Sequence, residues 1–195
     1  MKRLIIASGN QGKLREIRQI LSPLDFDVIP QSEYGVPDAE EPHATFLENA
    51  LEKARHASRL TGMAALSDDS GICVAALNGE PGIHSARYAG EPKSDEKNNL
   101  KLLDALRNAE DRRAHYYCVI VCLRHAMDPE PLIAEGTWQG EILKAPRGEG
   151  GFGYDPLFFD PVLGKTAAEL DHAIKNRVSH RAHALADLLQ KLGSL

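Results

Sequence analysis

Two adjacent carboxylates, Asp68 and Asp69, are the residues of this sequence with the clearest chemical potential. They follow a short apolar run, residues 63–66, and are followed at once by Ser70 and Gly71. An apolar run that ends in acids and a glycine is typical of a buried strand that opens into a ligand site at its carboxyl end. Because neighbouring carboxylates repel each other when they are buried without a cation or hydrogen-bond donors, the pair indicates a divalent metal, a proton transfer or both. A polar strand-to-loop turn with solvated acids is the alternative interpretation.

A glycine-containing loop near the N-terminus, residues 8–13, has the composition of a phosphate site. We expect a strand over residues 2–7 before it and a helix after it, because apolar residues recur at helical spacing beyond Lys13. Such a loop presents backbone N–H groups and the positive end of the helix dipole to an anion. Lys13 adds a point charge suited to phosphate. An ordinary strand-to-helix turn with an exposed lysine is the alternative.

A second helix is expected from Thr45 to about residue 61. Thr45 and Glu48 have the spacing of a capping box. Lys53 falls on the alanine-rich face of this helix, where a charged residue is unusual. Its side chain lies either at the edge of the buried stripe or in a cleft.

Residues 148–153 form a second glycine-rich loop, which permits close approach of the backbone to a ligand. The spacing matches G-x-G-x-x-G, but a dinucleotide site needs a strand before the motif and a helix after it. Pro156 follows too soon for that helix, so we reject the dinucleotide interpretation. Farther on, Ser179 is expected to cap the last helix. His180 would then lie at a helix start, either in a ligand site or as a solvated surface histidine.

The alternation of these elements predicts an α/β fold with a central mixed, largely parallel sheet flanked by helices, in a single domain over residues 1–195. The longest apolar run is too short to span a membrane, and the N-terminus is too short in apolar residues for a signal peptide. Three cysteines without a Cys-x-x-Cys motif argue against a zinc or redox site. A net charge of −5 argues against non-specific nucleic-acid binding. We therefore expect a cytoplasmic protein without nucleic-acid or membrane partners.

Six motifs occur in a fixed order over residues 8 to about 185. They are Ser8-Gly9-Asn10-x-x-Lys13-x-x-Glu16-Ile17, Phe46-x-Glu48-Asn49-Ala50-x-x-Lys53-Ala54, Asp68-Asp69-Ser70-Gly71, Gly79-x-Pro81-Gly82-x-x-Ser85-Ala86-Arg87, Gly150-Gly151-Phe152-Gly153-Tyr154-Asp155-Pro156 and Ser179-His180-Arg181. Together they resemble the inosine triphosphate pyrophosphatase family. The resemblance implies Mg²⁺-dependent hydrolysis of non-standard purine nucleoside triphosphates (dITP, ITP and XTP) to the monophosphate and pyrophosphate. It also implies a homodimer and two lobes with an active-site cleft between them.

The same resemblance assigns roles to individual residues. Asp69 would bind Mg²⁺, for which Mn²⁺ could substitute, and act on the attacking water, while Asp68 would orient water or a second metal ion. Glu41, with Glu40 as the alternate, would complete the metal site. The expected substrate-binding residues are Ser8, Gly9, Asn10, Gln11, Gly12, Lys13, Lys53, Ser70, Arg87, Phe152, Gly153, Tyr154, Asp155, Lys175, His180 and Arg181.

Recognition of the base is expected to depend on the purine 6-position. Phe152 would stack on the purine, and the base edge would be read by Asp155, Lys175, His180 and Arg181. A donor fixed at the 6-oxo group is left buried and unpaired when adenine binds, which rejects adenine strongly. This argument does not reject guanine, which also has a 6-oxo group.

Three other functions are weighed against this one. The first is a pyrophosphatase for modified pyrimidine nucleotides, which a comparison of dITP with dTTP and modified UTP would separate. The second is a non-catalytic nucleotide sensor, which the intact acids at Asp68 and Asp69 disfavour. The third is a nucleic-acid-binding module, which the net charge and an aromatic content of only 6% disfavour.

Overall fold

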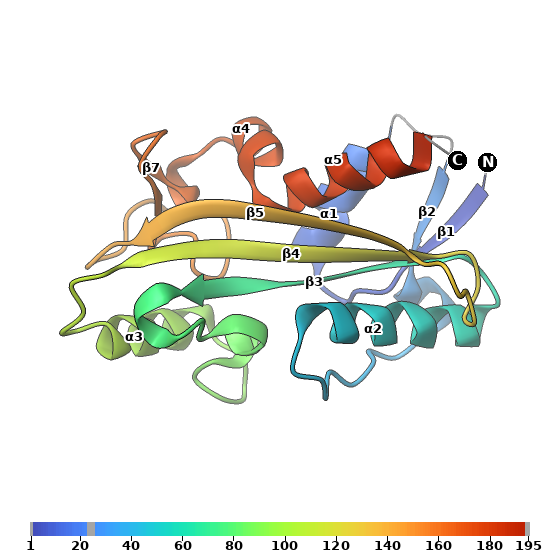
Figure 1. Cartoon of the computed structure of the whole chain (residues 1–195), viewed down its shortest axis with the longest axis horizontal. Helices are drawn as coiled ribbons and strands as arrows, with labels where there is room; N and C mark the ends of the chain where they lie inside the picture. Colours follow the sequence, from blue (N-terminus) through green and yellow to red (C-terminus); the bar gives the residue numbers. More distant parts are fainter. Residues whose placement is uncertain (1, 23–25, 194–195) are drawn as a thin grey trace. The chain divides into compact units, whose positions relative to one another are not determined.

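The computed structural model describes residues 2–22 and 26–193 of the 195-residue chain. Strands and helices alternate along much of the sequence (Figure 1). The elements are β1 (Lys2–Ile6), α1 (Gln11–Leu21), β2 (Phe26–Pro30), η1 (Gln31–Tyr34), α2 (Phe46–Thr61), β3 (Ala65–Val74), η2 (Ala75–Leu77), η3 (Gly82–Arg87), α3 (Asp95–Ala105), β4 (Arg113–Leu123), β5 (Leu132–Ile142), β6 (Phe158–Asp160), β7 (Lys165–Thr166), η4 (Ala167–Glu169), α4 (His172–Val178) and α5 (His180–Gly193).

The strands form one seven-stranded sheet in the order β2-β1-β3-β4-β5-β6-β7. β1 pairs in parallel with β2 and with β3, whereas β6 pairs antiparallel with both β5 and β7. The sheet is therefore mixed, and the α/β class expected from the sequence is confirmed. Parallel neighbours need long crossover connections, and the helices α1 and α2 lie in the connections that follow β1 and β2.

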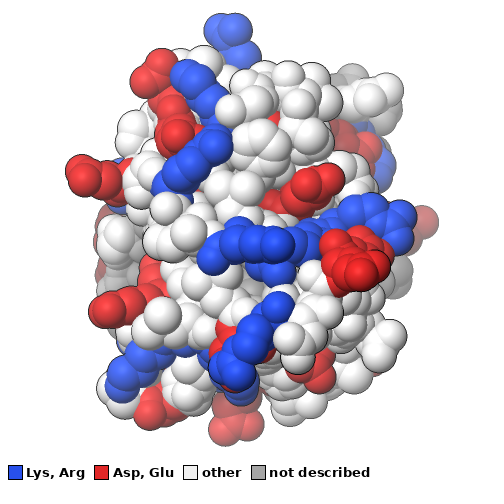
Figure 2. Space-filling model, turned by 90° about the vertical axis from the view of Figure 1, so that its left-hand side faces the viewer, with Lys and Arg blue, Asp and Glu red and all other residues white. Residues whose placement is uncertain are grey.

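The described surface and helices give two observations that bear on partners. Figure 2 shows one side of the molecule, on which Lys and Arg lie interspersed with Asp and Glu. This pattern differs from the one-signed basic surface that is typical of nucleic-acid-binding proteins. Within residues 2–22 and 26–193, no helix has both the length and the apolar character required to cross a bilayer.

The chain divides into two compact units, each assembled from separate parts of the sequence. Unit 1 consists of Met1–Asp69, Cys118–Gly136 and Arg181–Leu195, and unit 2 consists of Ser70–Tyr117 and Thr137–His180. The long strands β3, β4 and β5 each contribute residues to both units.

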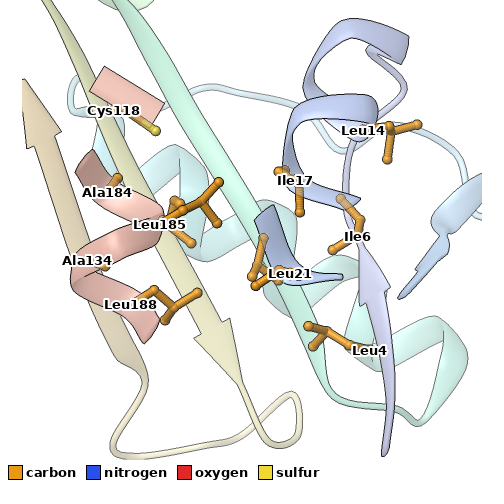
Figure 3. Packing of buried hydrophobic residues seen from close by; sticks show 12 residues of the cluster. Leu4, Ile6, Leu14, Ile17, Leu21, Cys118, Ala134, Ala184, Leu185 and Leu188 are labelled. Atoms are coloured by element: carbon orange, nitrogen blue, oxygen red, sulfur yellow. The ribbon is translucent and has the colours of Figure 1, made fainter. Parts of the chain in front are cut away.

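The core of unit 1 is built on β1, whose side chains alternate between the two faces of the sheet. Leu4 and Ile6 pack in one cluster with apolar residues of α1 and α5, including Ile17 and Leu188 (Figure 3). Ile5 instead packs in a second cluster that includes a buried alanine of α2. Helices therefore cover both faces of the sheet in this unit. Apolar residues recur in α1 and α5 with the 3.6-residue period of a helix, so each of these helices presents one apolar side to the sheet.

The core of unit 2 is rich in aromatic residues. Tyr116 and Trp138 both pack against Phe158, with ring centroids 4.6 Å and 4.9 Å away. The indole N–H of Trp138 donates to the buried carboxylate of Asp160 at 2.8 Å. Leu102 of α3 is fully buried in the same cluster. This core supports the loop that carries Phe152.

The extent of β3 differs from the sequence-based expectation. The apolar run was expected to end as a strand at the two acids, but β3 continues from Ala65 to Val74. Asp68 and Asp69 therefore lie in the middle of a buried strand. The expectation was wrong because it assumed that buried acids would interrupt the strand. Basic side chains from distant parts of the sequence instead compensate both carboxylates within the sheet.

The end of the chain also differs in detail. Ser179 directly precedes α5, which is the N-cap position expected for it, and its backbone N–H also closes the preceding helix, α4, on the carbonyl of Lys175. The helix α4 was not anticipated from the sequence, and α5 begins immediately afterwards at His180.

The side-chain cap that Thr45 was expected to form at the start of α2 is present, and it yields a first prediction. The Thr45 hydroxyl accepts from the backbone N–H of Glu48 at 3.2 Å and donates to its carboxylate at 2.6 Å. Thr45→Ala should lower the free energy of unfolding by about 1 kcal/mol. In a protein of this size, that loss lowers the Tm by about 2–4 °C. Thr45→Ser keeps the hydroxyl and serves as the matched control in a thermal melt. Equal melting temperatures for the two variants would contradict the capping role.

Candidate active site

Asp68 is buried at the centre of an ion-pair network in unit 1. Its Oδ2 lies 2.9 Å from the Lys13 ammonium and accepts from Arg181 Nη2 at 3.2 Å and Nε at 3.3 Å. Arg181 is itself buried, and its Nη1 donates to the carboxylate of Glu16. The network thus holds two carboxylates and two cations. Because the formal charges balance, four ionised groups can be kept where water is largely excluded.

Charge compensation keeps Asp68 ionised. Burial alone would raise the pKa of this carboxyl, but Lys13 and Arg181 outweigh it and hold the pKa well below the ordinary value of 3.8. Burial alone would lower the pKa of Arg181, but the nearby carboxylates of Asp68 and Glu16 outweigh it, so the pKa is raised above its ordinary value. Asp68 is therefore a fixed negative charge at neutral pH.

Asp69 lies next to Asp68 on β3 and has a different partner, because successive side chains of a strand point to opposite faces. The Lys53 ammonium of α2 donates to Asp69 Oδ1 at 2.8 Å and to Glu41 Oε1 at 2.8 Å. Burial raises the pKa of Asp69, and the attraction of Lys53 offsets only part of that effect. The Lys53 side chain is partly buried, but the carboxylates outweigh that burial and raise its pKa, so the ammonium stays charged.

The donor atoms around Lys53 are compatible with magnesium. Within the described ranges no cluster of three or more His, Cys, Asp or Glu side chains could enclose a metal ion. Mg²⁺ is usually bound by only one or two carboxylates, with water and substrate phosphates as its other ligands. Asp69 and Glu41 converge on one cation position, which the ammonium of Lys53 fills. Glu40 is exposed, so Glu41 is the member of the acidic pair that faces Asp69.

The loop between β1 and α1 is shaped by its own side chains. Asn10 caps α1, and its Oδ1 accepts from the backbone N–H groups of Gly12 at 2.8 Å and Lys13 at 3.1 Å. A side chain at Gly9 would place its Cβ 3.0 Å from a carboxylate oxygen of Asp38, so the site favours glycine. Asn10 thus occupies two of the backbone donors that were expected to face a phosphate. The ammonium of Lys13 projects to Asp68.

A second group of expected site residues is gathered in unit 2. The buried carboxylate of Asp155 accepts from Lys175 Nζ at 2.6 Å and from the backbone N–H of Phe152 at 2.9 Å. The same ammonium lies 4.7 Å from the centroid of the Phe152 ring. Phe152 is 38% exposed, which is unusual for a large apolar residue and leaves it accessible to a ligand.

His180 and Tyr154 are fixed within unit 2 rather than projecting as surface side chains. The His180 ring stacks on Tyr116 with centroids 4.6 Å apart and planes 10° from parallel. It is buried, so the interpretation as a solvated histidine is wrong. The Tyr154 hydroxyl donates to the Ser85 carbonyl at 2.8 Å, which makes Tyr154 a brace for the glycine-rich loop.

The expected site residues are thus distributed over both units. In unit 1 they are Ser8, Gly9, Asn10, Gln11, Gly12, Lys13, Glu40, Glu41, Lys53, Asp68, Asp69 and Arg181. In unit 2 they are Ser70, Arg87, Phe152, Gly153, Tyr154, Asp155, Lys175 and His180.

Sequence reasoning assigned no role to three residues that hold these groups in place. Glu16 pairs with Arg181, which lies 165 positions away in the sequence. Asp95 and Asn99 bind the backbone of Gly153 from 54 or more positions away. No local pattern connects α3 to the glycine-rich loop, so these two contacts could not be found from the sequence.

Comparisons with known proteins agree on one family. The model of the Ham1 family matches residues 4–191. A dITP/XTP pyrophosphatase of Nitrosomonas europaea is 64% identical over 192 residues, which cover 98% of this chain and 95% of that protein. A dITP/XTP pyrophosphatase of Ralstonia nicotianae is 63% identical, and the match covers 98% of this chain and 97% of that protein. The solved structure of a HAM1 protein from Coxiella burnetii superposes with a TM-score of 0.95 at 48% identity and covers 100% of both chains.

Proposed function

Because this chain belongs to the Ham1 family, we propose that it is a nucleoside triphosphate pyrophosphatase that removes non-standard purine nucleotides from the nucleotide pool. Its substrates are dITP, ITP and XTP, and its products are the monophosphate and pyrophosphate. The high identity to several dITP/XTP pyrophosphatases supports this substrate class. The observation that carries the chemistry is the convergence of Asp69 and Glu41 on one cation position.

The residues of unit 1 are proposed to bind the triphosphate and activate water. Lys13 and Lys53 neutralise phosphate oxygens, which carry about four negative charges in the substrate. Asp69 and Glu41 hold Mg²⁺ or Mn²⁺, which when bound neutralises further charge and lowers the pKa of water. Asp69 takes the proton from the water that attacks the α-phosphorus, and the bond to the bridging oxygen of the β-phosphate breaks. Asp68 keeps Lys13 in place and contributes a fixed charge.

The residues of unit 2 are proposed to recognise the base. Phe152 stacks on the purine, and the Lys175 ammonium donates to its 6-oxo group. An adenine offers an amino group at that position, so the ammonium is left without an acceptor and binding is weakened. Asp155 fixes Lys175 through their 2.6 Å contact. His180 and Arg181 complete the proposed set of base-reading residues, and Ser70 and Arg87 belong to the proposed substrate contacts.

We also propose that the chain works as one domain and as a homodimer in the cytoplasm. The passage of β3, β4 and β5 through both units supports a single functional domain. The nucleotide is the proposed partner, without a nucleic acid or a membrane, and the interspersed charges of the surface in Figure 2 agree with this.

A substrate panel tests the proposed function. Pyrophosphate release is measured with about ten nucleoside triphosphates, with and without Mg²⁺, including dITP, ITP, XTP, dATP, dTTP and a modified UTP. We expect kcat/KM for the first three to exceed that for dATP and dTTP by about 100-fold or more, since the fixed donor rejects a 6-amino group. Release should stop in excess chelator and return when Mg²⁺ is restored. A preference for the pyrimidines, or binding without release, would overturn the proposal.

A further inference from the structure

One residue of the glycine-rich loop, Gly153, is bound on both sides of its peptide backbone by α3. Its N–H donates to Asp95 Oδ2 at 2.7 Å, and its carbonyl accepts from Asn99 Nδ2 at 2.9 Å. Asp95 and Asn99 are four residues apart, so they lie on the same face of the helix, one turn from each other. All three residues belong to unit 2.

The loop depends on such external contacts because its own backbone is permissive. Gly151 and Gly153 have φ values of +77° and +62°, a region that glycine enters readily. A Cβ at Gly151 would also collide with the Asp155 carboxylate, so no residue with a side chain, and hence with a more restricted backbone, fits at this position. The order of the loop therefore comes from the side chains that hold it. These are Asp155 at the N–H of Phe152, the two α3 residues at Gly153, and the Tyr154 hydroxyl on the Ser85 carbonyl.

The Asn99 amide is oriented so that its Nδ2 donates to the Gly153 carbonyl. Its Oδ1 is buried and has no hydrogen-bond partner among the residues that the structure describes. Turning the amide over would bring this oxygen against the Gly153 carbonyl and lose the bond to Nδ2. The bond to the Gly153 carbonyl therefore fixes the orientation of the Asn99 amide and ties α3 to the loop.

We propose that Asp95 and Asn99 are positioning residues for base recognition, which they support by holding Phe152 in the orientation that stacks on the purine. This inference rests on the proposed function. Phe152 is the neighbour of Gly153, so loss of the α3 contacts allows the loop to populate other conformations. The apparent affinity for the base then falls in proportion to the stacking-competent fraction. The chemical step depends on Asp69 and its partners and is affected less.

The test compares Asp95→Ala with Glu96→Ala, a matched control that also removes one carboxylate from the first turn of α3. For Asp95→Ala, we expect the KM for dITP to rise about 10-fold, the effect of losing a charge-assisted hydrogen bond, with kcat within about 2-fold of the wild type. The preference for dITP over dATP should fall by a similar factor. Asp95→Asn keeps an acceptor oxygen and should restore most of the loss, and Glu96→Ala should match the wild type.

A second measurement is independent of catalysis. Calorimetry without metal should show IMP binding about 10-fold weaker in Asp95→Ala, and inorganic tripolyphosphate binding unchanged. Asn99→Ala removes the neutral donor and should weaken IMP binding about 3-fold. If Asp95→Ala does not fold, the result for Asn99→Ala tests the proposal. Equal KM and IMP affinity in Asp95→Ala and Glu96→Ala, or in Asn99→Ala and the wild type, would overturn the inference. Wild-type protein that releases no pyrophosphate from dITP would instead overturn the proposed function.

Discussion

Asp69→Asn is expected to lower kcat for dITP by about 1,000-fold or more while nucleotide binding stays within a few-fold of the wild type. Asparagine has the shape of aspartate but neither its charge nor its basicity. The variant therefore loses a metal ligand of full strength and the group that accepts the proton from water. Lys53 keeps its ion pair with Glu41 at 2.8 Å, so we expect the surrounding side chains to keep their positions. The measurements are pyrophosphate release and calorimetric binding of dITP.

The control for this variant is Asp111→Asn. Asp111 is bound to Arg113 by hydrogen bonds of 2.7–3.0 Å, and the Arg113 side chain is 77% exposed and that of Asp111 40%. Removing its charge should leave kcat within about 2-fold of the wild type, since exposed pairs contribute little. Turnover of dITP by Asp69→Asn at the rate of the control would show that the catalytic assignment is wrong.

The second large effect is expected on stability. Arg181→Met should lower the free energy of unfolding by about 3–5 kcal/mol, because it leaves the buried Asp68 with one cation fewer and removes the partner of Glu16. Methionine fills much of the volume, so the loss reports on charge more than on packing. In a protein of this length, the Tm should fall by at least about 6 °C. Denaturant unfolding followed by circular dichroism measures the change.

Three further variants, Arg113→Met, Asp68→Asn and a double variant, separate the charge effect from a general defect. Arg113→Met removes an exposed arginine and should change the free energy of unfolding by less than about 1 kcal/mol. The double variant Asp68→Asn/Arg181→Met should recover part of the stability lost in Arg181→Met, because it removes the uncompensated charge. If the double variant is as unstable as the sum of the two single variants, the buried ion pair is not the source of the effect.

Local patterns in the sequence were sufficient for most of the elements. Helical spacing identified α1 and α2, and the cap at Thr45 is present as expected. The extent of β3 was not predictable in the same way. Whether a strand can pass through two acids depends on Lys13, Lys53 and Arg181, which lie far from it in the sequence. Burial costs are set by tertiary partners, and a local pattern carries no information about them.

The candidate site shows the same division. The acids, the lysines and the aromatic residue could be named from residue type and motif spacing. Their pairings could not be named, as the choice of Glu41 over Glu40 illustrates, because two adjacent acids look alike in sequence. Only the fold shows that Glu41 meets Lys53 and that Glu40 is exposed. The roles of Asp95 and Asn99 were hidden for the same reason.

The composition of unit 1 has a consequence for protein synthesis. The unit contains the first 69 residues and also the final segment from Arg181 onward, whose leucines complete the core around β1. A nascent chain that stops before residue 181 therefore lacks α5 and the guanidinium opposite Asp68. Since domains usually fold as they emerge, the N-terminal part of unit 1 must keep apolar surface exposed until α5 has been translated. Removal of α5 would leave that surface uncovered permanently.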